Sequence, residues 1–134
     1  MATATVKWVY GKTFIGIDST RHSVILSTSA EDIGMRPSEL FLVALASCSS
    51  IDVVGILAKK KVKLTKYEVH VSAEQDADPP WTFHKVHLKY ILAGERIEEK
   101  DVKRAIHLSE HKYCSVAATV RGKAEITTEY VIEK

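Results

Sequence analysis

Alternating hydrophobic and polar positions predict short strands at the beginning of the chain. Thr5 to Tyr10 and Thr13 to Ile17 alternate on either side of Gly11, which is typical of a β-hairpin. Ser23 to Ser27 contains three consecutive aliphatic residues and predicts a third strand. Three strands are therefore expected before the first helix.

A long helical segment follows, with Pro37 at its first position, and it runs to Lys61 with Gly55 as its one interruption. Nearly every side chain from Leu40 to Leu57 is apolar or small, whereas a surface helix shows a single apolar stripe. This composition predicts a helix that is buried nearly all round. At 1.5 Å per residue such a helix is about 35 Å long, so we expect a second subunit to cover part of it.

The second half of the chain contains both strand and helix patterns. Alternation predicts two strands, and apolar residues at helical spacing predict two helices before a last strand. In chain order these are strands over Tyr67 to Ala73 and Thr82 to Leu92, helices over Glu98 to Tyr113 and Ser115 to Val120, and a strand over Lys123 to Ile132. The order βββ-α-ββ-α-α-β predicts an α+β fold with an antiparallel sheet.

Composition and charge narrow the class of protein. With 134 residues, 46% of them hydrophobic and 27% charged, the chain is typical of a single soluble globular domain over residues 1–134. The net charge is +2, and the basic cluster Lys59, Lys60, Lys61 and Lys63 ends the long helix, where cations interact favourably with the helix dipole. A basic stripe with interleaved aromatic residues is missing, so we expect no nucleic-acid partner.

The start of the chain bears on its location. Met1 to Trp8 lacks the basic start and apolar run of a signal peptide. No stretch of about 18 apolar residues is free of charge, so no membrane span or membrane partner is expected. We predict a cytoplasmic protein, and in that compartment two cysteines are more often reduced, catalytic or incidental than joined in a structural bridge.

The two cysteines lie in different local settings. Cys48 lies in the middle of the long helix, where a lone cysteine is commonly an inert small hydrophobe, but Ser47, Ser49 and Ser50 make its surroundings polar. Cys114 precedes the predicted short helix and follows His111 and Lys112, and all of these neighbours favour a thiolate. Local chemistry therefore favours Cys114 as the easier thiolate. The sequence leaves open whether the two sulfurs meet.

The segment before Cys114 also contains potential metal ligands. His107, His111 and Cys114 would share one face of a continuous helix, and two histidines with a cysteine can bind zinc. No fourth ligand is evident, and histidines at this spacing are common on helix surfaces. We predict no metal and no cofactor.

Two segments resemble the hallmarks of the OsmC/Ohr family, the osmotically inducible protein C and organic hydroperoxide resistance proteins. Arg36 to Cys48 reads RPSELFLVALASC, a proline-started helix that carries one cysteine, and Lys112 to Val116 reads KYCSV around the second. The likeness extends from Val6 to the last strand. It implies the OsmC-like fold, in which two chains form an intertwined homodimer with the long helices at its centre and the thiol sites at the interface.

The resemblance also implies a function. In characterised members the first cysteine attacks a peroxide and the second resolves it as a disulfide, which an external dithiol then reduces. The chain is thus expected to be a thiol peroxidase that reduces organic hydroperoxides in oxidative-stress defence, with Cys48 attacking and Cys114 resolving. The family pattern assigns the attack to Cys48, whereas local chemistry favours Cys114.

Supporting residues follow from the same comparison. The hydroperoxidase members have a glutamate directly after the proline, paired with an arginine from the early strands. Here Ser38 occupies that position, and Glu39 follows it, turned by about 100° around the helix. Candidates for holding the thiolate are therefore Glu39 and Ser38 on the helix, with Arg21 and Lys12 as the cations.

A competing hypothesis is a binding or redox-sensing dimer without peroxidase turnover. An apolar pocket at the dimer interface, lined by the long helix and by Trp81 or Phe83, would hold a small apolar or acyl ligand. On this hypothesis the cysteines are sensors or incidental, and replacing either of them leaves ligand affinity unchanged.

Overall fold

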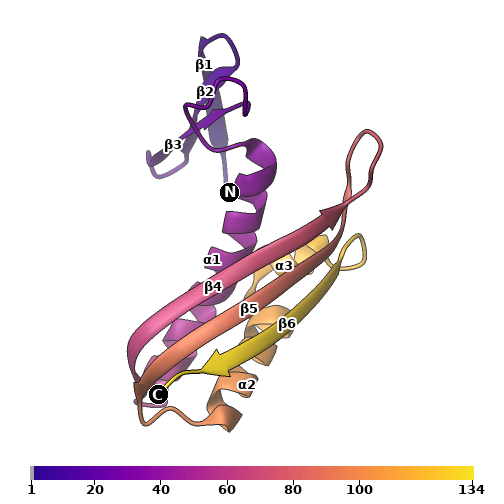
Figure 1. The fold of residues 1–134 in the computed structure, drawn as a ribbon. Helices are drawn as coiled ribbons and strands as arrows, with labels where there is room; N and C mark the ends of the chain where they lie inside the picture. The colour runs from indigo at the N-terminus through magenta and orange to yellow at the C-terminus, as the bar shows by residue number, and fades with distance from the viewer. Residues whose placement is uncertain (1) are drawn as a thin grey trace. The chain divides into compact units, whose positions relative to one another are not determined.

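The computed structural model describes residues 2–134, which form two compact units, an N-terminal unit that ends at Leu42 and a C-terminal unit over Val43–Lys134. The predicted order of elements is confirmed, with one π-helical turn, η1, in addition (Figure 1). The elements are β1 (Ala4–Tyr10), β2 (Thr13–Asp18), β3 (Ser23–Ser27), α1 (Pro37–Lys59), β4 (Lys63–Gln75), β5 (Phe83–Glu95), α2 (Glu99–Leu108), η1 (Ser109–Tyr113), α3 (Ser115–Val120) and β6 (Glu125–Ile132). The prediction of a single domain over residues 1–134 stays a prediction.

The N-terminal unit contains an antiparallel sheet with the strand order β1-β2-β3. Gly11 turns the first hairpin with a φ of +52°, a conformation that glycine adopts without steric cost. The register pairs Trp8 with Phe14 and Phe14 with Leu26, and it pairs Val6 with Gly16. Because directly paired residues share a face, these apolar side chains lie on one side of the sheet.

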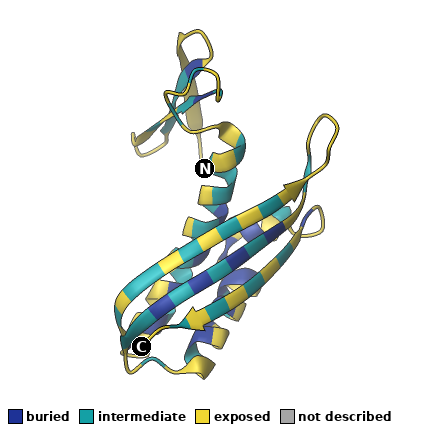
Figure 2. Ribbon diagram, in the orientation of Figure 1, coloured by how far each residue is buried: buried dark blue, intermediate teal, exposed yellow. Residues whose placement is uncertain are grey.

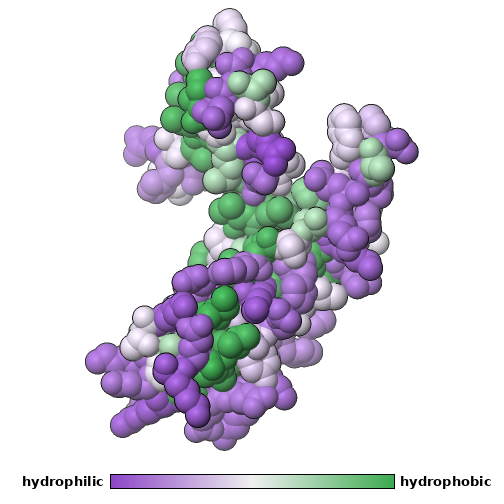
Figure 3. Space-filling model, in the orientation of Figure 1, coloured by the Kyte–Doolittle hydropathy of each residue, from purple (hydrophilic) through white to green (hydrophobic). Residues whose placement is uncertain are grey.

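That apolar face has little cover within its own unit. Val6 and Trp8 are 64% and 67% exposed, and among residues 2–42 only Thr13 and Ser27 are buried. Figure 2 shows β1 as exposed along its length, and Figure 3 shows hydrophobic residues at the surface of this unit. The N-terminal sheet therefore has correctly predicted strands but no apolar core of its own.

The C-terminal unit contains a mixed three-stranded sheet with the order β4-β5-β6. β4 and β5 are antiparallel, whereas β6 is parallel to β5, so the expectation of a fully antiparallel sheet is wrong at this edge. The reason lies in the connection, because α2, η1 and α3 lie between β5 and β6 in the chain. A crossover of this length can carry the chain back to the end of the sheet where β5 begins, so that β6 runs in the same direction as β5. A short hairpin cannot do this.

Helices cover one face of this sheet and form the core with it (Figure 1). On β5, Val86, Leu88, Tyr90 and Leu92 are buried at every second position, and Figure 2 shows this alternation along the central strand. They pack in a cluster with residues of α1 and α2, namely Val53, Leu57, Val62, Val102, Ala105 and Ile106. This core fixes the part of α1 that carries Cys48 against the element that leads to Cys114.

Helix α1 buries one stripe within the chain. Its buried residues are Leu45, Ser49, Val53 and Leu57, which recur at every fourth position. The expectation of burial nearly all round is therefore not met by a single chain, and Ile51, on another face of the helix, is 76% exposed. By length and composition α1 is also long and apolar enough to span a membrane, although the sequence was expected to contain no such segment.

Candidate functional site

Cys48 and Cys114 come from two elements that pack together in the C-terminal unit. Cys48 lies on α1, one residue before the buried Ser49. The π-helical turn η1 ends at Tyr113, and the N–H of the following Cys114 donates to the Ser109 carbonyl oxygen at 2.8 Å. The backbone of Cys114 then becomes extended, with φ −78° and ψ 107°, and Cys114 caps the start of α3. The local chain geometry therefore turns the Cys114 side chain out of the helical register and into the interior.

The two thiols are free and interact with each other. Cys48 lies close enough to Cys114 to raise the pKa of the Cys114 thiol. Cys114 is 2% exposed, whereas Cys48 is half-buried. The Cys114 sulfur also accepts a hydrogen bond from the Ala117 N–H at 3.3 Å. One chain thus brings together the two cysteines that the sequence analysis selected, one accessible and one enclosed.

Burial, with the neighbouring Cys48 acting in the same direction, raises the pKa of the Cys114 thiol to about 11. The backbone N–H groups of Ala117 and Val116 lower this pKa, but they do not outweigh burial. The expectation that the surroundings of Cys114 favour its thiolate is therefore wrong. The N-terminus of a short helix contributes less than the loss of solvent around a 2% exposed sulfur.

The basic neighbours of Cys114 in sequence point elsewhere. The Lys112 ammonium lies over the Tyr113 ring, 5.4 Å from its centroid. The His111 ring stacks on His107, with the centroids 4.5 Å apart. Neither Lys112 nor His111 is among the groups that set the Cys114 pKa. Nearness in sequence therefore does not place their charges at the sulfur.

A network of buried hydroxyl groups begins at Ser49, the residue after Cys48 on α1. Ser49 shares a short hydrogen bond with the Tyr90 hydroxyl. Ser109 donates to the Ser49 hydroxyl at 3.2 Å and to Asp52 Oδ2 at 3.1 Å. Burial raises the pKa of Tyr90 well above its ordinary value, so this hydroxyl stays protonated and can donate. The buried serine thus has the partners that a polar group in a core requires.

The other serines beside Cys48 are bonded as well. The Ser50 hydroxyl donates to the Ala46 carbonyl oxygen at 2.6 Å and accepts from the Tyr67 hydroxyl at 3.0 Å. Ser47 donates to the Ala44 carbonyl oxygen at 3.3 Å and is exposed. These bonds hold the two serines in defined positions on the helix.

The predicted supporting residues all lie in the N-terminal unit. Glu39 forms an ion pair with Arg36, 3.0 Å from Oε1 to Nη2, at the start of α1. The Lys12 N–H donates to Glu31 Oε1 at 3.4 Å, and Arg21 has a φ of +69° in the turn between β2 and β3. The partner of Glu39 within the chain is thus Arg36, which the sequence analysis did not select. The roles of Ser38, Glu39, Arg21 and Lys12 at the thiol site stay predictions.

His107, His111 and Cys114 do not share one face of a continuous helix. The α-helix gives way to the π-helical turn at Ser109, so Cys114 is not in register with His107 and His111. Among residues 2–134 no group of three or more histidine, cysteine and carboxylate side chains is arranged to hold a metal ion.

Sequence reasoning missed Tyr90 and Ser109, which complete the network. Tyr90 lies in the predicted strand Thr82 to Leu92 and Ser109 in the predicted helix Glu98 to Tyr113, and neither pattern indicates a hydrogen-bond partner across the fold. A polar residue at a position that the pattern marks as buried is the signal that could have found both, because such a group needs a partner.

Comparison with known proteins places this arrangement in a class. The solved structure of a hypothetical protein from Aquifex aeolicus VF5 superposes with a TM-score of 0.86 at 28% identity, covering 100% of this chain and 98% of that one. The organic hydroperoxide resistance protein OhrB of Bacillus subtilis has a TM-score of 0.64 at 15% identity, covering 98% of both chains. These matches confirm the predicted OsmC-like α+β fold.

Other known proteins resemble this chain in sequence as well as in fold. Protein YhfA of Escherichia coli K12 is 36% identical over 129 residues, which cover 96% of both chains. The sequence model of the family described as OsmC-like protein matches residues 29–129. The chain therefore belongs to the OsmC-like protein family.

Proposed function

We propose that the protein is a thiol-dependent reductase of organic hydroperoxides, in which Cys48 attacks the peroxide and Cys114 resolves the product. The observation that carries this proposal is the direct interaction of the two thiols within one chain. Family membership and the solved hydroperoxide resistance protein with the same fold support it. A cytoplasmic location, where dithiol reductants are available, belongs to the same proposal.

The different surroundings of the two thiols support this division of roles. Cys48 is half-buried, so a peroxide can reach it, whereas Cys114 is 2% exposed. A pKa of about 11 keeps Cys114 as a neutral thiol near pH 7. A resolving cysteine needs to meet the sulfenic acid rather than the substrate, so enclosure beside Cys48 suits it.

The reaction balances in three steps. The Cys48 thiolate attacks the terminal oxygen of ROOH, the O–O bond breaks, and with one proton the products are Cys48 sulfenic acid and ROH. The Cys114 thiol then displaces hydroxide from the sulfenic sulfur, and with its own proton this leaves as water while the Cys48–Cys114 disulfide forms. An external dithiol reduces this disulfide and is itself oxidised to a disulfide.

A homodimer is part of the proposal. Val43, Ile51 and Val54 expose 46%, 76% and 40% of their surface on α1, which is apolar along most of its length. Isolated exposed apolar residues are ordinary, but a run along one long helix indicates an interaction surface. A second copy of the chain would bury these residues and would account for an apolar helix that also meets the length and composition of a membrane span.

The test is peroxide consumption in steady state with dithiothreitol as reductant. The wild-type protein is expected to consume cumene hydroperoxide, and Cys48→Ser is expected to lose turnover. With dithiothreitol left out, Cys114→Ser is expected to stop after one equivalent, with sulfenic acid on Cys48. Ser47→Ala, beside Cys48 on an exposed position, is the control and is expected to keep turnover within about twofold. Absence of peroxide consumption by the reduced wild-type protein would overturn the proposal.

The competing binding hypothesis has less support from the fold. Trp81 is 55% exposed in the connection between β4 and β5, and Phe83 is the first residue of β5. The cavities that adjoin α1 and α2 are lined by other residues. A binding protein of this kind would keep its ligand affinity in both cysteine variants.

A further inference from the structure

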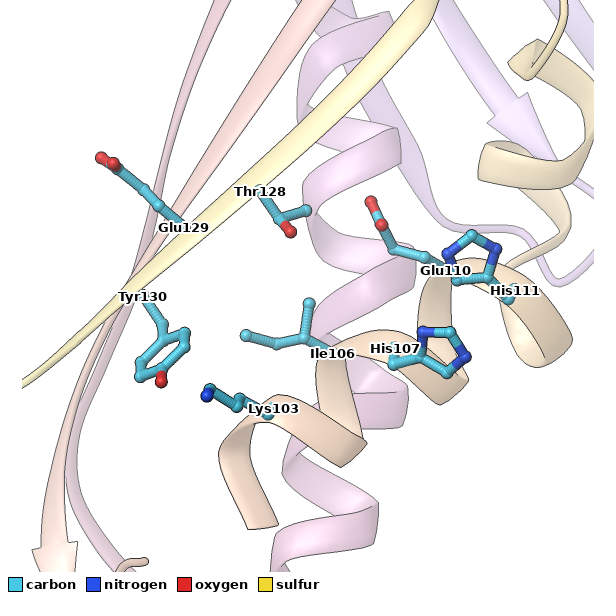
Figure 4. A pocket seen from close by; sticks show the side chains of 8 residues that line it. All are labelled: Lys103, Ile106, His107, Glu110, His111, Thr128, Glu129 and Tyr130. Carbon is cyan, nitrogen blue, oxygen red and sulfur yellow. The ribbon is translucent and has the colours of Figure 1, made fainter. Parts of the chain in front are cut away.

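A cavity of about 380 Å³ lies between the α2–η1 segment and β6. Figure 4 shows Ile106, His107, Glu110 and His111 projecting from the helical side, with Tyr130 and Thr128 on the strand side. Neither cysteine lines it, so the cavity is separate from the proposed reaction site. Its size and mixed lining are typical of a pocket for a small molecule.

Glu110 is the unusual group in this wall. The residue is only 9% exposed, and its Oε1 atom has no hydrogen-bond partner among residues 2–134. Burial raises the pKa of this carboxyl above its ordinary value, against the attraction of Arg121 and His107. A buried carboxylate oxygen without a partner is costly, and its cost is relieved by a ligand that donates a hydrogen bond.

Nearby basic groups are engaged elsewhere. The Arg121 guanidinium donates to the main-chain oxygen of Glu110, and no ion pair joins it to the Glu110 carboxylate within the described residues. The Lys103 ammonium pairs with Glu99 at 3.5 Å. Among residues 2–134, therefore, no positively charged side chain lies within ion-pair distance of the Glu110 carboxylate.

The other carboxylate at the cavity is directed away from it. Figure 4 shows the Glu129 side chain pointing away from the helices, and its Oε1 atom lies 3.5 Å from His87 Nε2 and 4.0 Å from Lys89 Nζ. The negative charge available to a molecule inside the cavity is thus that of Glu110.

The remaining walls are aromatic or apolar. The His107 and His111 rings lie against each other at a tilt of 37° with their centroids 4.5 Å apart, and burial lowers the pKa of His111, which favours its neutral form. The Tyr130 hydroxyl donates to Glu99, which leaves its ring at the wall, and Ile106 contributes hydrocarbon. Aromatic faces attract cations, and the apolar side chain suits the organic part of a ligand.

We propose that this cavity binds a small amine-bearing organic cation, with the ammonium group on the Glu110 carboxylate and the organic part against Ile106 and Tyr130. The ammonium supplies the hydrogen-bond donor that Glu110 Oε1 lacks, together with a positive charge in direct contact with the carboxylate. Glu110 also lies in a π-helical turn, a distortion that occurs frequently at functional sites.

The test is titration of the full-length protein with phenethylamine, followed by calorimetry and by amide chemical shifts. Phenethyl alcohol and hydrocinnamate are matched probes that replace the ammonium by a hydroxyl and by a carboxylate. Phenethylamine is expected to bind at least about tenfold more tightly than either, with shifts centred on residues 103–111 and 128–130, because hydrogen bonds to charged groups are the stronger ones.

Variants locate the effect. Glu110→Gln keeps the shape and is expected to abolish the preference for the amine, while Glu129→Gln, whose carboxylate points away from the cavity, is expected to keep it. Thr128→Lys would place a tethered ammonium at the wall and is expected to block the probe, which provides a second arm if Glu110→Gln does not fold. Equal affinity for amine and alcohol in the wild type, an unchanged preference in Glu110→Gln or Thr128→Lys, or shifts elsewhere would overturn the proposal.

Discussion

The two sheets of this chain have similar sequence patterns but very different burial. On β5 four residues, Val86, Leu88, Tyr90 and Leu92, are at most 1% exposed, whereas every residue of β1 is exposed. The difference arises because α1 and α2 cover β5 within the C-terminal unit, and no helix of residues 2–36 covers β1. Alternation therefore identifies a strand, but the burial of its apolar face depends on what packs against it.

The apolar residues of the two units contribute to stability in different ways. Apolar residues of the C-terminal unit stabilise the folded chain directly, whereas the apolar face of the N-terminal sheet can contribute only when something covers it. In the proposed homodimer a second chain supplies that cover. Substitutions in the two units should therefore change different quantities.

The largest effect is expected in the C-terminal core. Leu57 is fully buried between helix and sheet, and Leu57→Ala should lower the free energy of unfolding by about 3 kcal/mol because it leaves a cavity. Ile25→Ala, at a residue 48% exposed in the N-terminal sheet, should cost less than about 1 kcal/mol. Urea unfolding of both variants measures the contrast, and equal costs would mean that the two sheets do not differ in this way.

Association should respond to the N-terminal sheet instead. Val6→Glu places a charge on the apolar face of β1 and should weaken dimerisation about 100-fold, because an unpaired charge in an interface is strongly disfavoured. Lys7→Glu, on the opposite face of the same strand, should leave it nearly unchanged. Sedimentation equilibrium gives both constants. A dimer unaffected by Val6→Glu would show that this face lies outside the interface.

Burial in the C-terminal unit should also be visible in the pH dependence of stability. The Cys114 pKa is raised from 9.0 to about 11, so the folded state holds this proton more tightly than the unfolded state does. The protonated Cys114 thiol therefore contributes fully to the free energy of unfolding below about pH 9. As the pH rises towards 11, this contribution is lost, and the free energy of unfolding falls by up to about 2 kcal/mol.

Denaturant unfolding of the wild type and of Cys114→Ser, between about pH 8 and pH 10.5, isolates this contribution. The wild type should lose more stability than the variant over this range, because only the wild type has the thiol that titrates. Parallel curves for the two proteins would contradict the assignment of the raised pKa to Cys114.

A smaller effect is expected in the hydroxyl network. Ser109→Ala removes the donor to Ser49 and Asp52 and should lower the free energy of unfolding by about 1 kcal/mol. Ser72→Ala, on an exposed position of β4, should cost less than about 0.5 kcal/mol. Thermal unfolding of the two variants is sufficient, and equal melting temperatures would show that the Ser109 bonds add no stability.

Local patterns were sufficient for most elements. The strand Ser23–Ser27 and the helix Ser115–Val120 have the predicted bounds, since turn residues and a change of spacing mark their ends. Pro37 begins α1 as predicted, because proline suits the first turn of a helix, where its missing N–H has no partner to lose.

Features that depend on tertiary contacts could not be predicted from the sequence pattern. The π-helical turn at Ser109–Tyr113 does not change the spacing of apolar residues in a way that marks it. The parallel pairing of β6 depends on the end of the sheet to which the preceding helices return the chain. The Cys114 pKa depends on burial by distant segments, which sequence neighbours such as Lys112 do not reveal. The sequence could select Cys48 and Cys114, but only the fold shows that one is accessible and the other enclosed.

The most direct test of the proposed roles is a single turnover of the reduced protein with one equivalent of cumene hydroperoxide, quenched and mapped by peptide mass spectrometry. The wild type should yield an intramolecular Cys48–Cys114 disulfide, and Cys114→Ser should yield sulfenic acid on Cys48. Thiols that remain reduced, or sulfenic acid that forms on Cys114 while Cys48 stays a thiol, would contradict the account.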